Sequence, residues 1–253
     1  MPTYLDRYLA GEHEQVWADL VTLGPAVRDE PVSTDARAVA HETMRRARHN
    51  IETLIPRLRE IGYQFGYAWL QPGEEQHACG QPPVFDLPTP DCEAHLAELE
   101  RLAGPVPLSL HAFYEQIGVV NFVGAALGHW NLEGPIGDPM YVYPTGVAIE
   151  EHEDWAGSRT LHSRHGSLDG YPPFCWPIAP DALHKYNISG GMWYHVALPC
   201  AAADAPLEAE WHHTTFVNYL RICFRWGGFP GWERVESRPD SDLAFLTEGL
   251  LPI

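Results

Sequence analysis

The stretch FCWPIAPDALHKYNISGGMWYHVALP, residues 174–199, decides the fold. It contains two runs, FCWPIA and MWYHVALP, whose aromatic and β-branched residues are typical of strands. Gly190 and Gly191 lie between the runs and favour a turn. The stretch therefore predicts two strands joined through a glycine turn. Because side chains alternate between the two faces of a strand, we expect one of Trp193 and Tyr194 to face inward.

Helical patterns lie on both sides of this strand pair. Downstream, the segment TTFVNYLRICF (residues 214–224) offers Thr214 or Thr215 as a helix cap, and apolar residues follow at helical spacing. Upstream, residues 107–117 show the same spacing. The short runs VVNF, MYVYP and TGVAI predict further strands between Gly- and Pro-rich turns. Because these helices and strands do not alternate regularly, the sequence predicts an α+β fold.

Residues 1–62 are predicted to be helical, in three segments. The third is the clearest helix of the chain, and Ser33 or Thr34 can cap it. Pro56 removes a backbone donor, which predicts a kink or a break nearby. The face opposite the apolar stripe is basic, and we interpret it as a solvated face paired with Glu42, Glu52 and Glu60. Its members are Arg45, Arg46, Arg48, Arg57 and Arg59.

A proline-rich segment divides the chain. The preceding segment, YQFGYAWL, alternates as a strand does, whereas residues 71–90 contain five prolines and predict a loop and a possible domain boundary. Thr89 and Pro90 then provide a helix start. We therefore expect a helical region at residues 1–62 and an α+β domain at residues 63–253. That domain includes the loop and an apolar C-terminal tail, which is expected to pack back on the domain or on a partner.

The chain is strongly acidic. Sixteen basic and thirty-four acidic residues give a formal net charge of −18, which repels phosphate backbones and argues against nucleic acid as a direct partner. No run approaches the roughly 18 apolar residues of a membrane span, and the first residues lack a signal-peptide core. The five cysteines show no C-x-x-C spacing, so neither a disulfide framework nor a cysteine zinc site is predicted. We expect a cytoplasmic protein with no membrane partner, cofactor or metal.

Three histidine-bearing stretches have both a structural and a chemical interpretation. In WHHTTF, His212 and His213 are adjacent and point apart, which favours the lead-in to a packing helix over a metal site. In EEHEDW, His152 lies among carboxylates, which indicates an exposed acidic loop or, alternatively, an ion or proton-transfer site. In SRTLHSRHG, His162 and His165 accompany serines but match no nucleophile motif.

The remaining motifs do not indicate an enzyme. Cys175 is flanked by Phe174 and Trp176, which predicts a buried structural cysteine rather than a nucleophile. Neither of the glycine-rich phosphate-binding patterns occurs in the chain. The sequence therefore carries no strong catalytic signature.

Three stretches together resemble the SUKH superfamily, which includes fungal cell-wall synthesis regulators and bacterial toxin-immunity proteins. They are ELERLAGPVPLSLHAFYEQIG at residues 98–118, the strand pair at residues 174–199, and TTFVNYLRICF at residues 214–224. Their order and spacing match the superfamily over roughly residues 90–228. The resemblance implies an α+β domain with a twisted, mainly antiparallel sheet backed by helices. It also implies a function in binding another protein, without shared catalytic residues.

The first functional hypothesis is a non-enzymatic, immunity-type protein that binds and neutralises a toxin. An acidic protein approaches a basic active surface quickly and can occupy it with carboxylates. The candidate contact residues are Glu150, Glu151, Glu153, Asp154, Trp193 and Tyr194.

Two alternatives remain. The first is a regulatory or scaffold protein of the same fold that works through residues 1–62. The second is a metal-assisted hydrolase that uses His152, or His162 together with His165.

Overall fold

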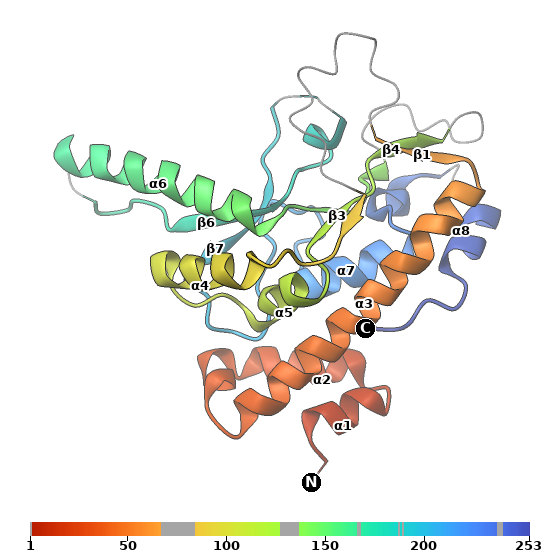
Figure 1. Cartoon of the computed structure of the whole chain (residues 1–253), viewed down its shortest axis with the longest axis horizontal. Coiled ribbons are helices and arrows are strands. Elements are labelled where there is room, and N and C mark those ends of the chain that lie inside the picture. The colour runs from red at the N-terminus through yellow and green to blue at the C-terminus, as the bar shows by residue number, and fades with distance from the viewer. Residues whose placement is uncertain are drawn as a thin grey trace.

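The computed structural model describes residues 2–66, 84–126, 137–165, 168–186, 188, 190–236 and 240–253. In this part of the chain, helices surround small antiparallel sheets and a helical region comes first (Figure 1). The predicted α+β class is confirmed. Within the described residues, no helix has both the length and the apolar character that crossing a bilayer requires.

The first 60 residues form α1 (Tyr4–Leu9), α2 (His13–Thr22), the 3-10 helix η1 (Gly24–Arg28) and α3 (Val32–Glu60). The cap predicted for α3 is wrong: its N-cap position is Pro31, without a side-chain cap, so neither Ser33 nor Thr34 caps it. The helix continues through Pro56, so a break there is also wrong, whereas the kink stays a prediction. Leu54 and Leu58, two residues to either side of the proline, are fully buried and hold both turns in the core.

Among the described residues, the strands form three short antiparallel sheets rather than one broad sheet. The first pairs β1 (Tyr63–Phe65) with β4 (Gly124–Ala126), and the third pairs β6 (Phe174–Ala179) with β7 (Tyr194–Leu198). In the second, β3 (Val119–Asn121) lies between β2 (Phe85–Asp86) and β5 (Tyr141–Val142). A hydrogen bond from Tyr143 N to Ile178 O, 2.9 Å long, connects the second sheet to the third. The strand pair predicted from residues 174–199 is therefore β6 and β7.

The proline-rich region is only partly described. Residues 67–83 lie outside the described residues, and with them the second half of the predicted strand YQFGYAWL, much of the loop and Cys79. The described end of the loop contributes β2. The next helix, α4 (Cys92–Ala103), begins two residues after the predicted start, with Asp91 rather than Thr89 at its N-cap position. It is followed by α5 (Leu108–Gln116), as predicted.

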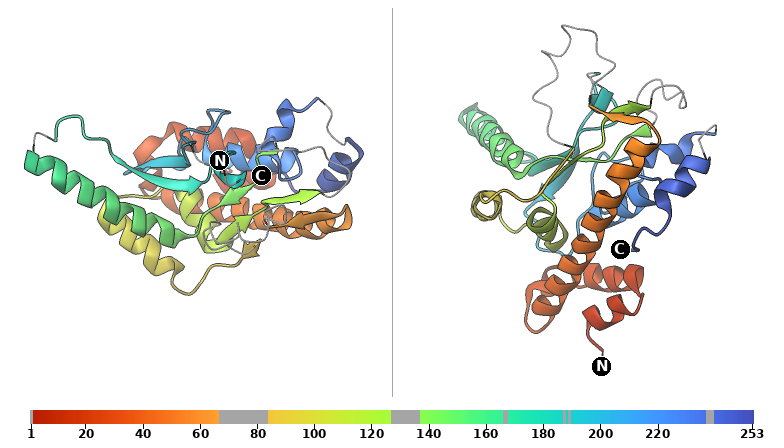
Figure 2. Two further views of the ribbon diagram at one scale, coloured as in Figure 1. Left: turned by 90° about the horizontal axis from the view of Figure 1, so that it is seen from above. Right: turned by 45° about the vertical axis from the view of Figure 1, so that its right-hand side comes forward.

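The longest departure from prediction is α6 (Thr145–His165), which replaces both the predicted strand TGVAI and the predicted acidic loop EEHEDW. Its inward residues are Ala148, His152 and Trp155, spaced by four and three, and they form a helical stripe. His152, which lies among carboxylates in the sequence, occupies the middle of that stripe. The apolar residues alone therefore did not show the helical spacing of α6. In Figures 1 and 2, α6 lies beside α4 and extends past the rest of the fold.

The N-terminal helices and the C-terminal tail pack on the strands and helices between them. The long α3 lies against α5, and one hydrophobic cluster includes buried residues from both (Figure 1). After α7 (Phe216–Arg225), the tail forms η5 (Pro230–Arg234) and α8 (Asp240–Thr247). Phe229, Trp232, Leu246 and Ile253 are buried, which confirms that the tail packs back.

Candidate protein-binding surfaces and a charged cleft

The predicted acidic contacts lie on one stretch of α6. We call Glu150, Glu151, Glu153 and Asp154 the acidic turn; Glu151 is half-buried and the other three are exposed. His152, in the middle of the sequence, faces the core instead, with its ring 4.9 Å from the Phe174 ring and 5.3 Å from the Trp155 ring. Burial and the nearby Arg101 lower the pKa of His152. The helix thus separates the histidine from the carboxylates that surround it in the sequence.

The acidic turn carries charge that the surrounding protein does not neutralise. None of its four carboxylates forms an ion pair or hydrogen bond with a described residue. The pKa of Glu151 is raised by burial and by the like charges of Asp154 and Glu150. A cation that approached this turn would relieve the repulsion between neighbouring carboxylates.

Beyond the acidic turn, residues 157–164 of α6 are exposed on every side (Figure 2). Arg159 lies over the Trp155 ring at 5.3 Å, and the His162 ring lies 5.3 Å from the Tyr171 ring. The side chain of His165 lies outside the described residues. Among the described residues, no group of three or more histidine, cysteine or acidic side chains is arranged to hold a metal ion.

A second exposed surface is the segment between β6 and β7, residues 181–193, which we call the apolar loop. Four large apolar side chains project from it: Leu183, Ile188, Met192 and Trp193. Asp181 shapes its start by accepting hydrogen bonds from the main-chain nitrogens of Leu183 and His184, both at 2.8 Å. Gly191 passes so close to the Asp181 carboxylate that a Cβ would overlap it. Asp181 therefore fixes the start of the loop and lies against Gly191, although these four apolar side chains face solvent.

A buried ion pair connects the apolar loop to Asp138. Lys185, in the 3-10 helix η4 (His184–Tyr186), is fully buried and donates to Asp138 at 2.5 Å. The Tyr194 hydroxyl donates to the other Asp138 oxygen at 3.0 Å. Tyr194 is only 3 % exposed, so its proposed contact role is wrong, whereas Trp193 is 40 % exposed. This confirms that one of the two faces inward.

The histidine pair before α7 separates in the way that its sequence predicts. His212 is held between two carboxylates, with Nδ1 2.5 Å from Glu210 and Nε2 3.0 Å from Glu233, and its ring stacks on Trp211. His213 instead turns the chain with a positive φ of 54°. Sequence analysis missed Glu210 and Glu233, because nothing in the local pattern pairs them with His212.

Cys175 is half-buried rather than buried. Its neighbours on β6, Phe174 and Trp176, face the core, and alternation along the strand turns Cys175 outward. Burial, with a smaller contribution from Glu208, raises the pKa of the Cys175 thiol. A raised pKa disfavours the thiolate, which is the reactive form.

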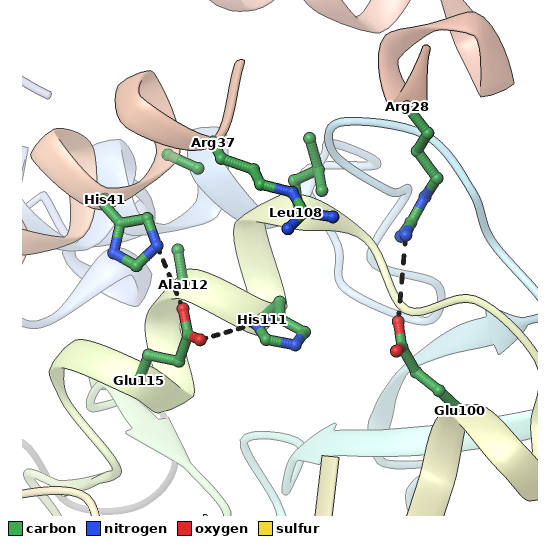
Figure 3. A pocket seen from close by; sticks show the side chains of 9 residues that line it. Arg28, Arg37, His41, Glu100, Leu108, His111, Ala112 and Glu115 are labelled. Carbon is green, nitrogen blue, oxygen red and sulfur yellow. Dashed lines mark ion pairs between the residues drawn. The ribbon is translucent and has the colours of Figure 1, made fainter. Parts of the chain in front are cut away.

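A charged cleft of about 90 Å³ opens between α3 and η1 on one side and α4 and α5 on the other (Figure 3). It was not predicted from the sequence. Its floor is formed by Ala40, Leu108 and Ala112. Its charged and titratable side chains are Arg28, Arg37, His41, Glu100, His111 and Glu115.

Glu115 organises one end of this cleft. Its two carboxylate oxygens lie 3.2 Å from His41 Nε2 and 3.2 Å from His111 Nδ1. The hydrogen bond from His111, with the charges of His111, His41 and Arg37, lowers the pKa of Glu115 despite its partial burial. Glu115 is therefore a carboxylate at neutral pH and lies within ion-pair distance of both rings.

The tautomers of the two histidines follow from their neighbours. The Gln116 amide nitrogen lies 3.2 Å from His41 Nδ1, and because an amide nitrogen can only donate, His41 Nδ1 accepts. The proton of His41 is then on Nε2, which faces Glu115. His111 faces Glu115 through Nδ1, which leaves its Nε2 directed away from Glu115 (Figure 3).

Comparisons of the chain with models of known protein families, with curated proteins and with solved structures find no match. Function is therefore inferred from the surfaces and the cleft described above.

Proposed function

We propose that the chain is a non-enzymatic, cytoplasmic protein-binding module that captures a basic protein. In the specific form of the proposal, it is an immunity-type protein that neutralises a toxin by covering the toxin's active surface. The observation that carries the proposal is the acidic turn, whose four carboxylates have no cationic partner among the described residues. The resemblance of three stretches to the SUKH superfamily supports the same interpretation.

Electrostatics supports a basic partner over a neutral one. The chain has a formal net charge of −18, which accelerates the encounter with a basic protein. At close range, the pKa of Glu151 is raised by burial and, in addition, by repulsion from Asp154 and Glu150. Lysine or arginine side chains placed against the turn would replace that repulsion with attraction.

The apolar loop supports a protein partner over a small cation. Interface cores are enriched in tryptophan and methionine, and charged residues gather at their rims. Met192 is 62 % exposed and lies beside the partly exposed Trp193, on a loop fixed by the Lys185–Asp138 pair. Exposed apolar side chains of this kind gain free energy when a protein partner buries them.

We expect the fourfold variant Glu150→Ser, Glu151→Ser, Glu153→Ser, Asp154→Ser to lose its partner. If each pair contributes only about 0.5 kcal/mol, four pairs contribute about 2 kcal/mol, which is roughly a 30-fold weaker complex. The measurement is affinity capture of the tagged full chain from extracts of its native cell, at low and at raised salt. The wild-type chain should retain one stoichiometric basic protein that salt releases.

The matched control removes the same charge from dispersed exposed positions. Asp29, Glu60, Glu236 and Glu248 are exposed carboxylates without an ion pair to a described residue. Replacing them with serine also changes the formal net charge from −18 to −14, since four negative charges are removed. This control should retain the partner. Equal retention by the wild type and the α6 variant would remove the acidic turn from the proposal.

Binding at the acidic turn should release protons. Because the pKa of Glu151 is raised in the free chain, a cationic partner would lower it and displace the proton that Glu151 holds at mildly acidic pH. The affinity should therefore increase as the pH rises through the free-state pKa of Glu151. Titration calorimetry of the captured partner near pH 5, in two buffers with different ionisation enthalpies, measures the release. The Glu151→Gln variant should show less of it, and a buffer-independent enthalpy for the wild type would contradict contact at Glu151.

A further inference from the structure

The arginines of α3 differ in how the protein uses them. The predicted pairing of the basic face is confirmed at Glu42 and Glu52: Arg45 and Arg46 bind Glu42, and Arg48 binds Glu52. Two further arginines are also engaged, since Arg57 donates to main-chain carbonyls and Arg59 lies 5.6 Å from the Phe65 ring. Arg37 is the exception on this helix, because no described residue accepts a hydrogen bond from its guanidinium.

Arg37 lines the charged cleft from α3, whereas His111 lines it from α5 (Figure 3). The other charged groups of the cleft are already paired. Arg28 donates to the main-chain oxygens of Val106 and Ala201 and lies 4.0 Å from Glu100. Glu100 also accepts from Val106 N at 3.2 Å, and Glu115 is paired with His41 and His111. Only Arg37 and His111 Nε2 therefore remain to bind a ligand, judged by the bonds among described residues.

We propose that the charged cleft binds a small oxyanion, a phosphate or carboxylate group, through the Arg37 guanidinium and His111 Nε2. Glu115 forms an ion pair with His111 Nδ1 and orients the ring, and in the imidazolium form Nε2 also donates. A planar guanidinium presents paired donors that match the geometry of phosphate and carboxylate oxygens. Arg28 lies at the rim, where it donates to main-chain carbonyls and lies 4.0 Å from Glu100.

The size and charge of the cleft restrict the ligand. A cleft with a volume of about 90 Å³ has room for a few water molecules, which suits one anionic group but not a whole nucleotide. The rest of a larger ligand would lie outside the cleft. A metal ion is disfavoured, because Arg28 pairs with Glu100 and Glu115 with two histidines, while Arg37 has no ion pair with a described residue and would repel a cation. This inference does not depend on the proposed protein-binding function, because it concerns α3 and α5 rather than α6 and the apolar loop.

The test follows the imidazole nitrogens of the full chain labelled with ¹⁵N-histidine. Inorganic phosphate and acetate are titrated separately near pH 6 at constant ionic strength, and the His111 signals are assigned with the variant His111→Gln. At least one of the anions should shift the His111 signals saturably. Saturation by phosphate alone identifies a phosphate group as the ligand chemistry, and saturation by acetate identifies a carboxylate.

The variant Arg37→Gln should bind the same anion about tenfold more weakly or worse, because a charged hydrogen bond contributes roughly 1.5 kcal/mol or more. Arg48→Gln is the matched control, since Arg48 lies on the same helix but pairs with Glu52 outside the cleft. Its affinity should stay within about twofold of the wild type. No saturable shift of His111 with either anion, or equal weakening by Arg37→Gln and Arg48→Gln, would overturn the proposal.

Discussion

Lys185→Met is expected to destabilise the protein by about 3–5 kcal/mol, because it leaves the Asp138 carboxylate buried without its cation. Lys185 is fully buried and Asp138 is 2 % exposed, so water cannot replace the lost partner. The Tyr194 hydroxyl would remain as a donor to Asp138, but one neutral hydrogen bond does not offset a buried charge. Urea unfolding followed by tryptophan fluorescence measures the change in the free energy of unfolding.

The matched control is the double variant Lys185→Met with Asp138→Asn. Removing both charges removes the uncompensated carboxylate, and the asparagine oxygen can still accept from Tyr194. Asparagine also tolerates the positive φ of 43° at position 138. The double variant should recover most of the lost stability. A single variant as stable as the wild type, or a double variant as unstable as the single, would show that the pair is not held as the structure describes.

The ion pair also matters for the proposed interface. Lys185 lies in the apolar loop, so its buried ammonium fixes the segment that exposes Met192 and Trp193. If the double variant regains stability but binds the partner more weakly, the ion pair positions the loop. This would agree with the use of buried polar groups for conformational specificity rather than for stability.

The sequence correctly predicted those helices and strands whose apolar residues in the local pattern are also the residues buried in the fold. The stripe of α7 is apolar in the sequence and buried in the fold, and the β6–β7 pair combines strand-forming residues with a glycine turn. The prediction failed for α6 because its inward stripe contains His152 and its outward face contains consecutive carboxylates. A local run of charge resembles a loop, whereas the helix is decided by the burial of three residues against β6 and α4.

The acidic turn and the charged cleft also differ in how far the sequence predicts them. The acidic turn is contiguous in the sequence, so its members could be named in advance although their helix could not. The charged cleft joins Arg37 and His41 of α3 to His111 and Glu115 of α5, about seventy residues later, through the packing of the two helices. No local spacing encodes that approach, and without aligned relatives no pattern of joint variation is visible. Tertiary packing alone creates this site.

Asp204 provides a second large effect on stability and explains how α7 begins. Its carboxylate, 3 % exposed, accepts from Ser109 Oγ at 2.7 Å, from Ala205 N at 3.0 Å and from Val217 N at 3.1 Å. Thr215 occupies the N-cap position of α7, as predicted, but its side chain makes no capping hydrogen bond. A residue thirteen positions before Val217 thus satisfies a main-chain donor of the first turn and joins α7 to α5.

Asp204→Ala is therefore expected to lower the free energy of unfolding by about 3 kcal/mol, because it leaves a buried hydroxyl and two main-chain donors without their acceptor. The matched control, Ser109→Ala, removes one donor but leaves Asp204 with both main-chain bonds, so it should lose only about 1 kcal/mol. Urea unfolding at neutral pH compares the two variants with the wild type.

If Asp204→Ala lowers the free energy of unfolding no more than Ser109→Ala does, water or Thr215 supplies the missing acceptor, and α7 does not depend on Asp204. If the difference is as large as expected, the first turn of α7 is held by a side chain from outside the helix, which the bridge between Pro206 and Thr215 and the packing of α5 bring into place.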